Sequence, residues 1–335
     1  MNPLVSILIP LYNSEKWIKS TIESALAQTW ENKEIIVVDD GSTDDSFSIA
    51  KQYESKILKV ITQENSGACV ARNRALSMSQ GDFIQWLDSD DILAPDKIEI
   101  QLGNSDQSPQ SKVLHSSAFG LFYFRIKKAK FNLNPLCQDL SPLNWLLMHI
   151  GKGHWMIPAA WLVSRKLTDL AGPWDERLML NQDGEYFCRV VASSELVKFH
   201  PKARSYYRQG NLSSISSIRE GKSLESLNFS KTLNVDLLLK LEDSEITREA
   251  CINYLQRSLF FPSNLESPVI ESNRKRIIEL GGSIDPPVMT RKFSIFKNIF
   301  GLKTARIFKN KLWHMEIIIR KYWDKILANI FRDGI

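Results

Sequence analysis

The chain has 335 residues, 43% of them apolar and 24% charged, which is typical of a folded globular protein and excludes a disordered or fibrous one. Its longest apolar runs, such as IPAAWLV (157–163), are well short of the roughly 18 residues that a spanning helix needs, so neither a membrane span nor a secretory signal is predicted. The net charge of +5 arises in residues 289–335, where eleven Lys or Arg stand against three Asp or Glu.

The spacing of the cysteines indicates the redox compartment in which the protein is expected. The four cysteines have no paired spacing, which predicts neither a disulfide framework nor a zinc site. A reducing, cytoplasmic setting is therefore expected, and no nucleic-acid partner is predicted.

Short apolar, β-branched runs alternate with helical patterns in the first hundred residues. Strands are expected at 4–10, 34–40, 56–62 and 82–88. Between them, apolar side chains recur at helical spacing from Ile18 to Leu26, and again from Ala68 to Leu76 behind Gly67. This alternation predicts an α/β fold with a mostly parallel sheet flanked by helices.

The segments that leave these strands carry clustered carboxylates, above all DDGSTDD (39–45) and DSDD (88–91). In open parallel sheets ligands bind beyond the carboxyl ends of the strands. Clustered carboxylates repel unless a cation offsets them, and Mg²⁺ or Mn²⁺ is held by one or two carboxylates plus substrate phosphates. DSDD therefore predicts a metal and diphosphate site. The alternative is that Asp90 and Asp91 cap a helix over DILAPDKIEIQL, with Pro95 in its first turn.

Four motifs in order resemble the family 2 glycosyltransferases: VSILIPLYN (5–13), IIVVDDGSTDDS (35–46), NSGACVARNRAL (65–76) and GDFIQWLDSDD (81–91). A weaker match continues to about residue 215 through GPWDERLMLNQDGEYFCRV (172–190) and YYRQGNLSS (206–214). The resemblance implies the Rossmann-like GT-A fold and an inverting transfer of a sugar from a nucleotide donor, usually a UDP-sugar. It also implies Mn²⁺ or Mg²⁺ held by a DXD motif.

The resemblance implies roles in donor binding for several of these residues. Tyr12 would lie against the base and Asp40 would accept its ring imide proton, although a strand-end core aromatic is the alternative for Tyr12. Asp39 is expected to order the GST turn instead. The implied donor-binding residues are Pro10, Tyr12, Asn13, Asp40, Arg72, Asp88 and Ser89.

The resemblance makes Asp90 the direct metal ligand, with Asp91 as a further acidic neighbour. Arg72 would reach the pyrophosphate or pair with the acidic cluster, whereas Arg74 reads as a surface residue.

A general base is expected at Asp183, at the opening of a helix whose buried face carries Phe187 and Val190. The helix dipole would keep this carboxylate ionised. The alternative is that Asp183 or Asn181 only caps the helix. The family more often has Glu where this chain has Gln182, and Glu185 is the reserve base.

An acceptor site is expected in GKGHWMIPAAWLVSR (151–165), where His154 and Trp155 precede an apolar strand. Both could equally be core or loop residues. Processive synthases of this superfamily carry a Gln-x-x-Arg-Trp motif. No Trp follows an Arg in this chain, so the resemblance implies addition of a single sugar and not polymerisation. The absence of a Gly-x-Gly-x-x-Gly or Walker loop argues against a dinucleotide oxidoreductase or a phosphate-loop nucleotidase.

Three parts of the chain are expected: a GT-A domain at 1–220, a helical extension at 221–288, and a basic amphipathic helical tail at 289–335. The tail carries apolar residues at helical steps from Phe308 through Leu312 and Met315 to Ile330. Two explanations stay open, a helix packing on the domain and a helix attached to anionic lipid at the inner face of the membrane.

Together these patterns predict a metal-assisted, non-processive glycosyltransferase acting on a saccharide or lipid-linked acceptor. A catalytically silent nucleotide-binding or assembly protein is the alternative; it would show decay of the base or of the DXD motif, and both are intact. A phosphoacceptor receiver domain is excluded because such a domain is only about 120 residues long, whereas the motifs here extend to Asp183.

Overall fold

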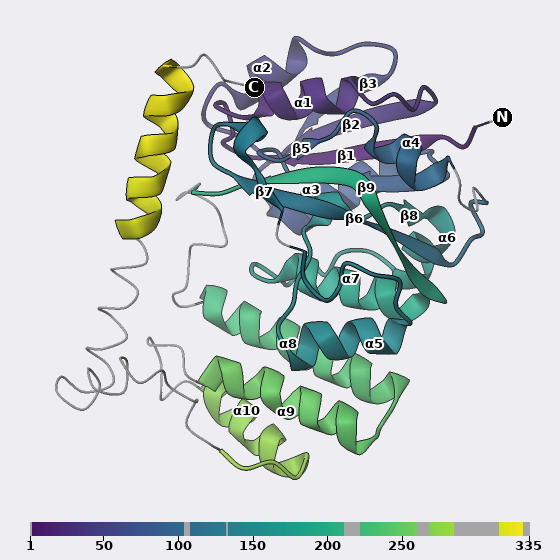
Figure 1. Cartoon of the computed structure of the whole chain (residues 1–335), viewed down its shortest axis with the longest axis vertical. Coiled ribbons are helices and arrows are strands. Elements are labelled where there is room, and N and C mark those ends of the chain that lie inside the picture. The colour runs from purple at the N-terminus through teal and green to yellow at the C-terminus, as the bar shows by residue number, and fades with distance from the viewer. Residues whose placement is uncertain are drawn as a thin grey trace.

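A five-stranded, mostly parallel sheet forms the first half of the fold (Figure 1). The computed structural model describes residues 2–103, 108–131, 133–210, 222–259, 268–284 and 315–330. The strand order is β3-β2-β1-β4-β8, and only β8 runs antiparallel. Its strands are β1 (Val5–Leu11), β2 (Lys33–Asp39), β3 (Leu58–Thr62), β4 (Phe83–Trp86) and β8 (Val163–Ser164). The four strands expected from the sequence are confirmed, as is the α/β class.

Helices cover this sheet because their apolar stripes match its buried surfaces. The helices between the first strands are α1 (Ile18–Leu26), α2 (Ser46–Lys51) and α3 (Ala68–Met78). Ile18, Ile22 and Ala25 on α1 are fully buried, while α3 packs on β1 and β2. Both helices occupy the ranges that the 3.6-residue periodicity predicts.

A second sheet, which the sequence did not predict, follows the acidic loop. Its order is β5-β9-β6-β7, and its strands are β5 (Ile92–Leu93), β6 (Val113–Phe122), β7 (Lys130–Phe131) and β9 (Leu196–Arg208). Ile92 pairs with Tyr206 in antiparallel register, so the backbone stays extended after the acidic loop. Helix α4 (Lys97–Leu102) begins only after this pair. The alternative in which Asp90 and Asp91 cap that helix is therefore wrong.

The apolar run at 157–163 is not a continuous strand. Pro158–Ala160 forms a 3₁₀ turn, and only Val163 and Ser164 join the sheet, before α6 (Arg165–Ala171). Proline lacks a backbone N–H and fixes its own φ, so Pro158 suits the first position of a short helical turn and not a central strand. The expected strand after Trp155 is thus corrected to a turn and a two-residue strand.

The remaining helices lie below the two sheets in the view of Figure 1. They are α5 (Pro142–Leu146), the π-helical turn η2 (Leu147–Gly151), α7 (Gln182–Ser193), α8 (Lys222–Leu241), α9 (Glu245–Leu259) and α10 (Pro268–Glu279). Successive members contact each other from α7 through α8 and α9 to α10. Phe187, Val190 and Val191 form the buried face of α7, as expected.

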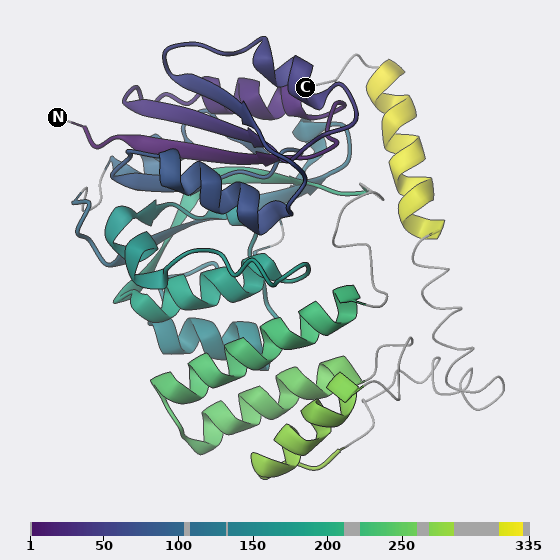
Figure 2. The same cartoon turned by 180° about the vertical axis from the view of Figure 1, so that it is seen from behind.

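A helix over residues 315–330 stands at the side of the α/β part, as the front and back views agree (Figures 1 and 2). The expected helical tail is thus seen in part; Phe308 and Leu312 lie outside the described residues. Among the described helices, none combines the length and the apolar character needed to cross a bilayer. All four cysteines are described and unpaired, as predicted.

Burial of His149 links the stability of this helical layer to pH. Its ring stacks on Trp145, with centroids 5.2 Å apart, and burial lowers the pKa of His149 from 6.5 to about 4. Its Nδ1–H donates to the His154 carbonyl at 2.7 Å. Because the folded state disfavours protonation, this ring's contribution is fully present above about pH 6.5 and is lost as the pH falls toward about 4.

We expect the melting temperature of the wild type to fall more between pH 7 and pH 4.5 than that of His149→Phe, which keeps an aromatic ring on Trp145 but cannot titrate. Thermal unfolding of both proteins at the two pH values measures the difference. Equal decreases in the two proteins would contradict the assignment.

Candidate active site

The loops that follow β1, β2 and β4 meet at one edge of the sheet. The Ser14 hydroxyl lies 2.8 Å from the Ser89 hydroxyl, which joins the first loop to the acidic loop. Asn13, at φ 45°, donates its N–H to Ser42 Oγ at 3.0 Å and accepts the Thr43 N–H at 2.8 Å. These bonds join the predicted donor-binding residue Asn13 to the loop after β2, and Ser89 to the loop after β1.

Tyr12 and Pro10 lie at the end of β1. Pro10 pairs in register with Val38, and the Tyr12 side chain is 45% exposed. A strand-end core aromatic would be buried, so the structure does not support that alternative for Tyr12. A face free to receive a nucleobase remains available there.

The two carboxylates that end β2 have different partners. Asp39 accepts the Thr62 hydroxyl at 3.0 Å and the Ser42 N–H at 3.4 Å, and it therefore orders the turn as expected. Asp40 is 3% exposed and accepts the Gly67 N–H at 2.8 Å, together with bonds from Gln63 and the Ser66 N–H. Gly67 has φ 97°, in the region that favours glycine. Asp40 thus holds the start of α3; its contact with a base stays a prediction.

The acidic loop 88–91 is held by Arg208 at the end of β9. The Arg208 N–H donates to Asp91 Oδ1 at 3.0 Å, and its Nε donates to the Asp90 carbonyl at 2.9 Å. Burial lowers the pKa of Arg208 to about 10, so it stays a cation at neutral pH. Its guanidinium also lies 4.3 Å from the centre of the Trp17 ring. This clamp was not predicted, because Arg208 lies more than a hundred residues from the loop.

Asp91 is the most strongly perturbed carboxyl of the loop. It is fully buried, and its Oδ2 has no hydrogen-bond partner in the part of the chain that the structure describes. Burial raises the pKa of Asp91 well above its ordinary value, and the charges of Asp90 and Asp88 raise it further. Asp88, Asp90 and Asp91 therefore lie close enough together to disfavour one another's negative charge.

Arg72 joins the acidic loop to the predicted base. Its Nη2 donates to Asp88 Oδ1 and its Nη1 donates to Gln182 Oε1, both at 2.8 Å. The guanidinium lies 4.4 Å from the centre of the Trp174 ring and is 7% exposed. Burial lowers the pKa of Arg72, but the charge of Asp88 outweighs it and the net shift is upward. Since Gln182 directly precedes Asp183, one side chain fixes both halves of the candidate site.

Asp183 occupies the first turn of α7, as the sequence predicted, but its electrostatics differ from the expectation. Burial raises the pKa of Asp183, and the Asp88 carboxylate raises it further, against Arg72 and the N–H groups of the helix start. The expected dominance of the helix dipole is therefore wrong. A carboxylate with a raised pKa holds a transferred proton better.

Asn181 and Glu185, the two residues considered beside Asp183, are engaged in other interactions. Asn181 forms no capping bond through its side chain, and its amide donates to Ser230 Oγ at 2.9 Å. Glu185, the reserve base, is 4% exposed and pairs with Arg189 at 2.6 Å. Glu185 is therefore occupied in an ion pair along the helix.

Trp155 lies on an aromatic wall that leads to the carboxylates. Its ring centre is 5.1 Å from Phe119 and 5.9 Å from Tyr207. Burial raises the pKa of Tyr207, and the charges of the acidic loop and of Asp183 raise it further, which places Tyr207 near both. For His154, the hydrogen bonds that the structure shows are made by its backbone: its carbonyl accepts from His149 Nδ1–H and its N–H donates to the Met148 carbonyl. Tyr207 was missed, although it stands in the quoted motif YYRQGNLSS.

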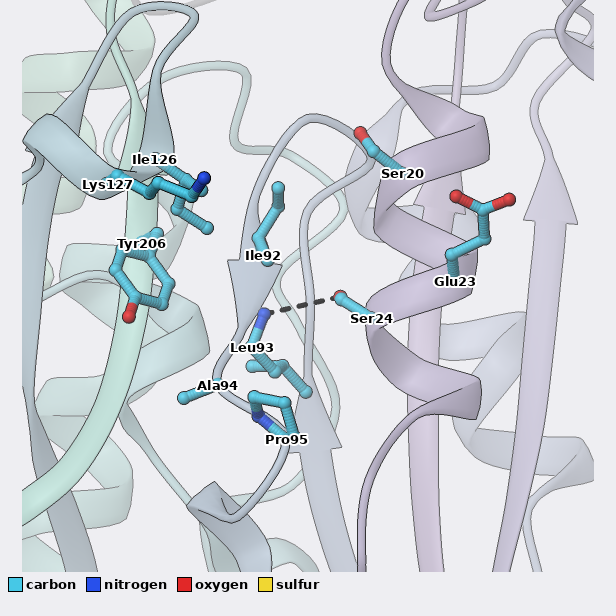
Figure 3. A pocket seen from close by; sticks show the side chains of 10 residues that line it. All are labelled: Ser20, Glu23, Ser24, Ile92, Leu93, Ala94, Pro95, Ile126, Lys127 and Tyr206. Carbon is cyan, nitrogen blue, oxygen red and sulfur yellow. Dashed lines mark hydrogen bonds between the residues drawn. The ribbon is translucent and has the colours of Figure 1, made fainter. Parts of the chain in front are cut away.

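A hollow of about 300 Å³ lies between α1 and β5 and contains none of the predicted site residues (Figure 3). Glu23 and Ser24 line it from α1, Lys127 from the turn Ile126–Lys128, and Tyr206 from β9. Side chains alternate along a strand, so Tyr206 faces this hollow while Tyr207 faces the other way, toward the carboxylates. The hollow is therefore separate from the candidate active site.

A parallel sheet with carboxylates at its strand ends, extended by a second sheet, defines the GT-A class of α/β protein. The chain matches a family model described as glycosyl transferase family 2 over residues 6–137. It is 30% identical over 253 residues to an uncharacterized glycosyltransferase of Rickettsia typhi, covering 72% of this chain and 76% of the relative. The chain therefore belongs to the family 2 glycosyltransferases, and it is a transferase enzyme.

Two further relatives extend the comparison. Over 103 residues the chain is 48% identical to TuaG of Bacillus subtilis, a putative teichuronic acid biosynthesis glycosyltransferase, covering 30% of this chain and 41% of the relative. A crystal structure of S. aureus TarS 1–349 in complex with UDP superposes with a TM-score of 0.61 at 20% identity, covering 82% of this chain and 80% of that one. The second likeness concerns the fold.

Replacing Arg72 by Lys should weaken the link between the acidic loop and α7, because a single ammonium cannot reproduce the planar fork that binds Asp88 and Gln182. We expect a loss of about 1–3 kcal/mol in the free energy of unfolding, measured by urea titration. Arg74→Lys, in an exposed position of the same helix, is the control and should change it by less than about 0.5 kcal/mol. Equal losses in the two variants would contradict the assigned role.

Proposed function

We propose that this protein transfers a single sugar from a nucleotide-sugar donor, a UDP-sugar, to a hydroxyl of a saccharide or lipid-linked acceptor, with inversion at the anomeric carbon. The observation that carries the proposal is the pair of 2.8 Å bonds from Arg72 to Asp88 and to Gln182. They bring the acidic loop, which would bind a diphosphate and a cation, next to Asp183, which would accept a proton. Donor activation and acceptor deprotonation can therefore occur in one place.

The donor end of the site supports a uridine nucleotide. Tyr12 is exposed at the end of β1 and offers an aromatic face, and Asp40 lies at the end of the adjacent strand. TarS, which shares the fold, was crystallised with UDP and also with UDP-GlcNAc. Pro10, Asn13 and Ser89 would complete the donor site from the same loops.

The acidic loop fits a divalent cation of the Mg²⁺ or Mn²⁺ type. Carboxylate oxygens are the ligands that these ions prefer, and Asp88 and Asp90 lie close to the buried Asp91, whose Oδ2 has no hydrogen-bond partner among the described residues. No three His, Cys, Asp or Glu side chains of the described residues converge on a metal position, so Asp90 and the donor diphosphate would share the coordination. When bound, the cation would neutralise charge on the leaving diphosphate.

Asp183 would accept the proton of the acceptor hydroxyl. As that oxygen forms its bond to the anomeric carbon, the bond from this carbon to the diphosphate oxygen breaks on the opposite face, and the proton passes to the Asp183 carboxylate. One displacement inverts the configuration. Arg72 keeps Asp88 in place throughout, because its guanidinium is buried and fixed from both sides.

The aromatic wall of Phe119, Trp155 and Tyr207 would receive the acceptor. Trp155 is 45% exposed and borders Tyr207, which lies near the carboxylates. Sugar rings bind well to such faces because their C–H groups contact the aromatic surface. His154 would contribute from the same loop. TuaG is named for teichuronic acid biosynthesis, which supports a role in polysaccharide biosynthesis for this chain too.

Titration calorimetry with UDP, GDP and dTDP, each with and without Mn²⁺, tests the donor site. We expect one nucleotide, UDP, to bind in a metal-dependent manner, and Asp90→Asn to abolish this binding because a carboxylate ligand is lost. Asp45→Asn removes the same charge from an exposed position and should bind as the wild type does. If no nucleotide binds with metal, the proposal fails and a silent scaffold is favoured.

Asp183→Asn separates binding from chemistry. The variant should bind UDP as the wild type does but release UDP from the sugar donor about 10²–10⁴ times more slowly, since the base is lost. Hydrolysis of the donor, with water in place of the acceptor, provides the assay. Loss of UDP binding in this variant would indicate a structural role instead.

The pH dependence of the same reaction tests the position of Gln182. Activity should fall as the pH decreases toward the raised pKa of Asp183, because the base must be deprotonated. Gln182→Glu places a negative charge next to Asp183 and should move this acidic limb to higher pH. A limb at the same pH in both proteins would contradict Asp183 as the base.

A further inference from the structure

The helix at 315–330 contacts the domain through its polar side. Asp324 Oδ2 accepts the N–H groups of Phe124 and Arg125 at 2.9 and 3.2 Å, and its Oδ1 accepts Arg125 Nε at 2.8 Å. Lys321 Nζ donates to the Gly210 carbonyl at 2.5 Å. Ala328, one turn after Asp324, is 8% exposed. Asp324, Lys321 and Ala328 thus define the docked side of the helix.

The apolar side of the same helix faces away from the domain. At about 100° per residue, Ile319 and Trp323 lie roughly opposite Lys321 and Ala328 around the helix axis. Six large apolar side chains are between 51% and 66% exposed: Met315, Ile318, Ile319, Tyr322, Trp323 and Ile330. A surface helix of a globular protein normally buries such a stripe and exposes its charges. Here the arrangement is reversed, so the packing explanation for the tail does not hold for 315–330.

Lys325 lies next to Ile318 around the helix axis, at the border of the exposed stripe. Burial lowers the pKa of Lys321, and the charges of Lys16 and Lys325 lower it further. Lys16 and Lys325 are exposed, as are Lys127 and Lys128, which follow the Arg125 that Asp324 binds. Both acidic residues of the described helix are paired with arginines, Asp324 with Arg125 and Glu316 with Arg320. The side that meets solvent therefore combines apolar and cationic groups.

We propose that helix 315–330 docks the protein on the surface of an anionic lipid bilayer, lying in the plane of the interface. Adjacent Tyr and Trp side chains favour the headgroup region, and lysines beside an apolar stripe attract acidic lipids. The charge complementarity selects an anionic bilayer over an uncharged apolar partner. A helix of 16 residues is about 24 Å long, sufficient for a peripheral contact.

The docked helix is connected to the candidate active site through two short steps. Asp324 binds residues 124 and 125, and the preceding Tyr123 carbonyl accepts Arg208 Nη1 at 3.0 Å. Arg208 in turn holds the acidic loop. The bilayer would therefore lie beside the site, where a lipid-linked acceptor would be met; this last step rests on the proposed function, whereas the docking itself does not.

Sedimentation with vesicles of phosphatidylcholine, with and without phosphatidylglycerol, tests the proposal. The full chain should bind the anionic vesicles and not the neutral ones, and high salt should weaken the binding. Ile319→Ser/Trp323→Ser should lower the vesicle affinity by about tenfold or more, because two inserted apolar side chains are lost. Ile246→Ser/Ile278→Ser, at exposed apolar positions of α9 and α10, is the matched control and should bind as the wild type does.

Three outcomes would overturn the proposal: no vesicle binding by the wild type, equal loss in the two double variants, or a dimer in light scattering that Ile319→Ser/Trp323→Ser converts to a monomer. The last would assign the stripe to a second copy of the chain. Failure here is distinguishable from failure of the proposed function. Ile319→Ser/Trp323→Ser should still bind UDP, whereas Asp90→Asn should still bind vesicles.

Discussion

The buried Arg72 guanidinium connects two segments that lie nearly a hundred residues apart. With one arm it binds Asp88 in the acidic loop and with the other Gln182 at the start of α7, while Trp174 covers its face. A buried cation needs a compensating charge, and Asp88 is the carboxylate that provides it. The distance between the place where a diphosphate would bind and the place where a proton would be accepted is set by this one side chain.

The rest of the site is electrostatically unbalanced around that link. Asp91 is buried with one oxygen unpartnered, and both Asp91 and Asp183 have raised pKa values because burial and neighbouring carboxylates act in the same direction. Such an arrangement costs stability in the free protein. Under the proposed function, it would become favourable once a cation and a donor diphosphate occupy the loop.

Gln182 gives Asp183 an uncharged neighbour. Where a Glu would add a second negative charge against Arg72, the amide accepts the same hydrogen bond without charge. The Asp183 carboxylate therefore lies next to a neutral neighbour, and Asp88 is the main carboxylate that raises its pKa. The helix at 315–330 uses one of its two acidic residues, Asp324, for docking and leaves its apolar side exposed.

The sequence by itself determined the four parallel strands, α1, α3 and α7, and the positions of Asp88, Asp90 and Asp183, because apolar periodicity and loop chemistry are local properties. Only the tertiary structure decided what depends on contacts between distant segments. Pairing of Ile92 with Tyr206 replaced an expected helix start by a strand. Arg208 and Tyr207 entered the site from the far end of a second sheet, and burial reversed the expected effect of the helix dipole on Asp183. The face that helix 315–330 turns toward the domain was likewise undecided, because an apolar stripe looks the same whether it packs inward or faces out.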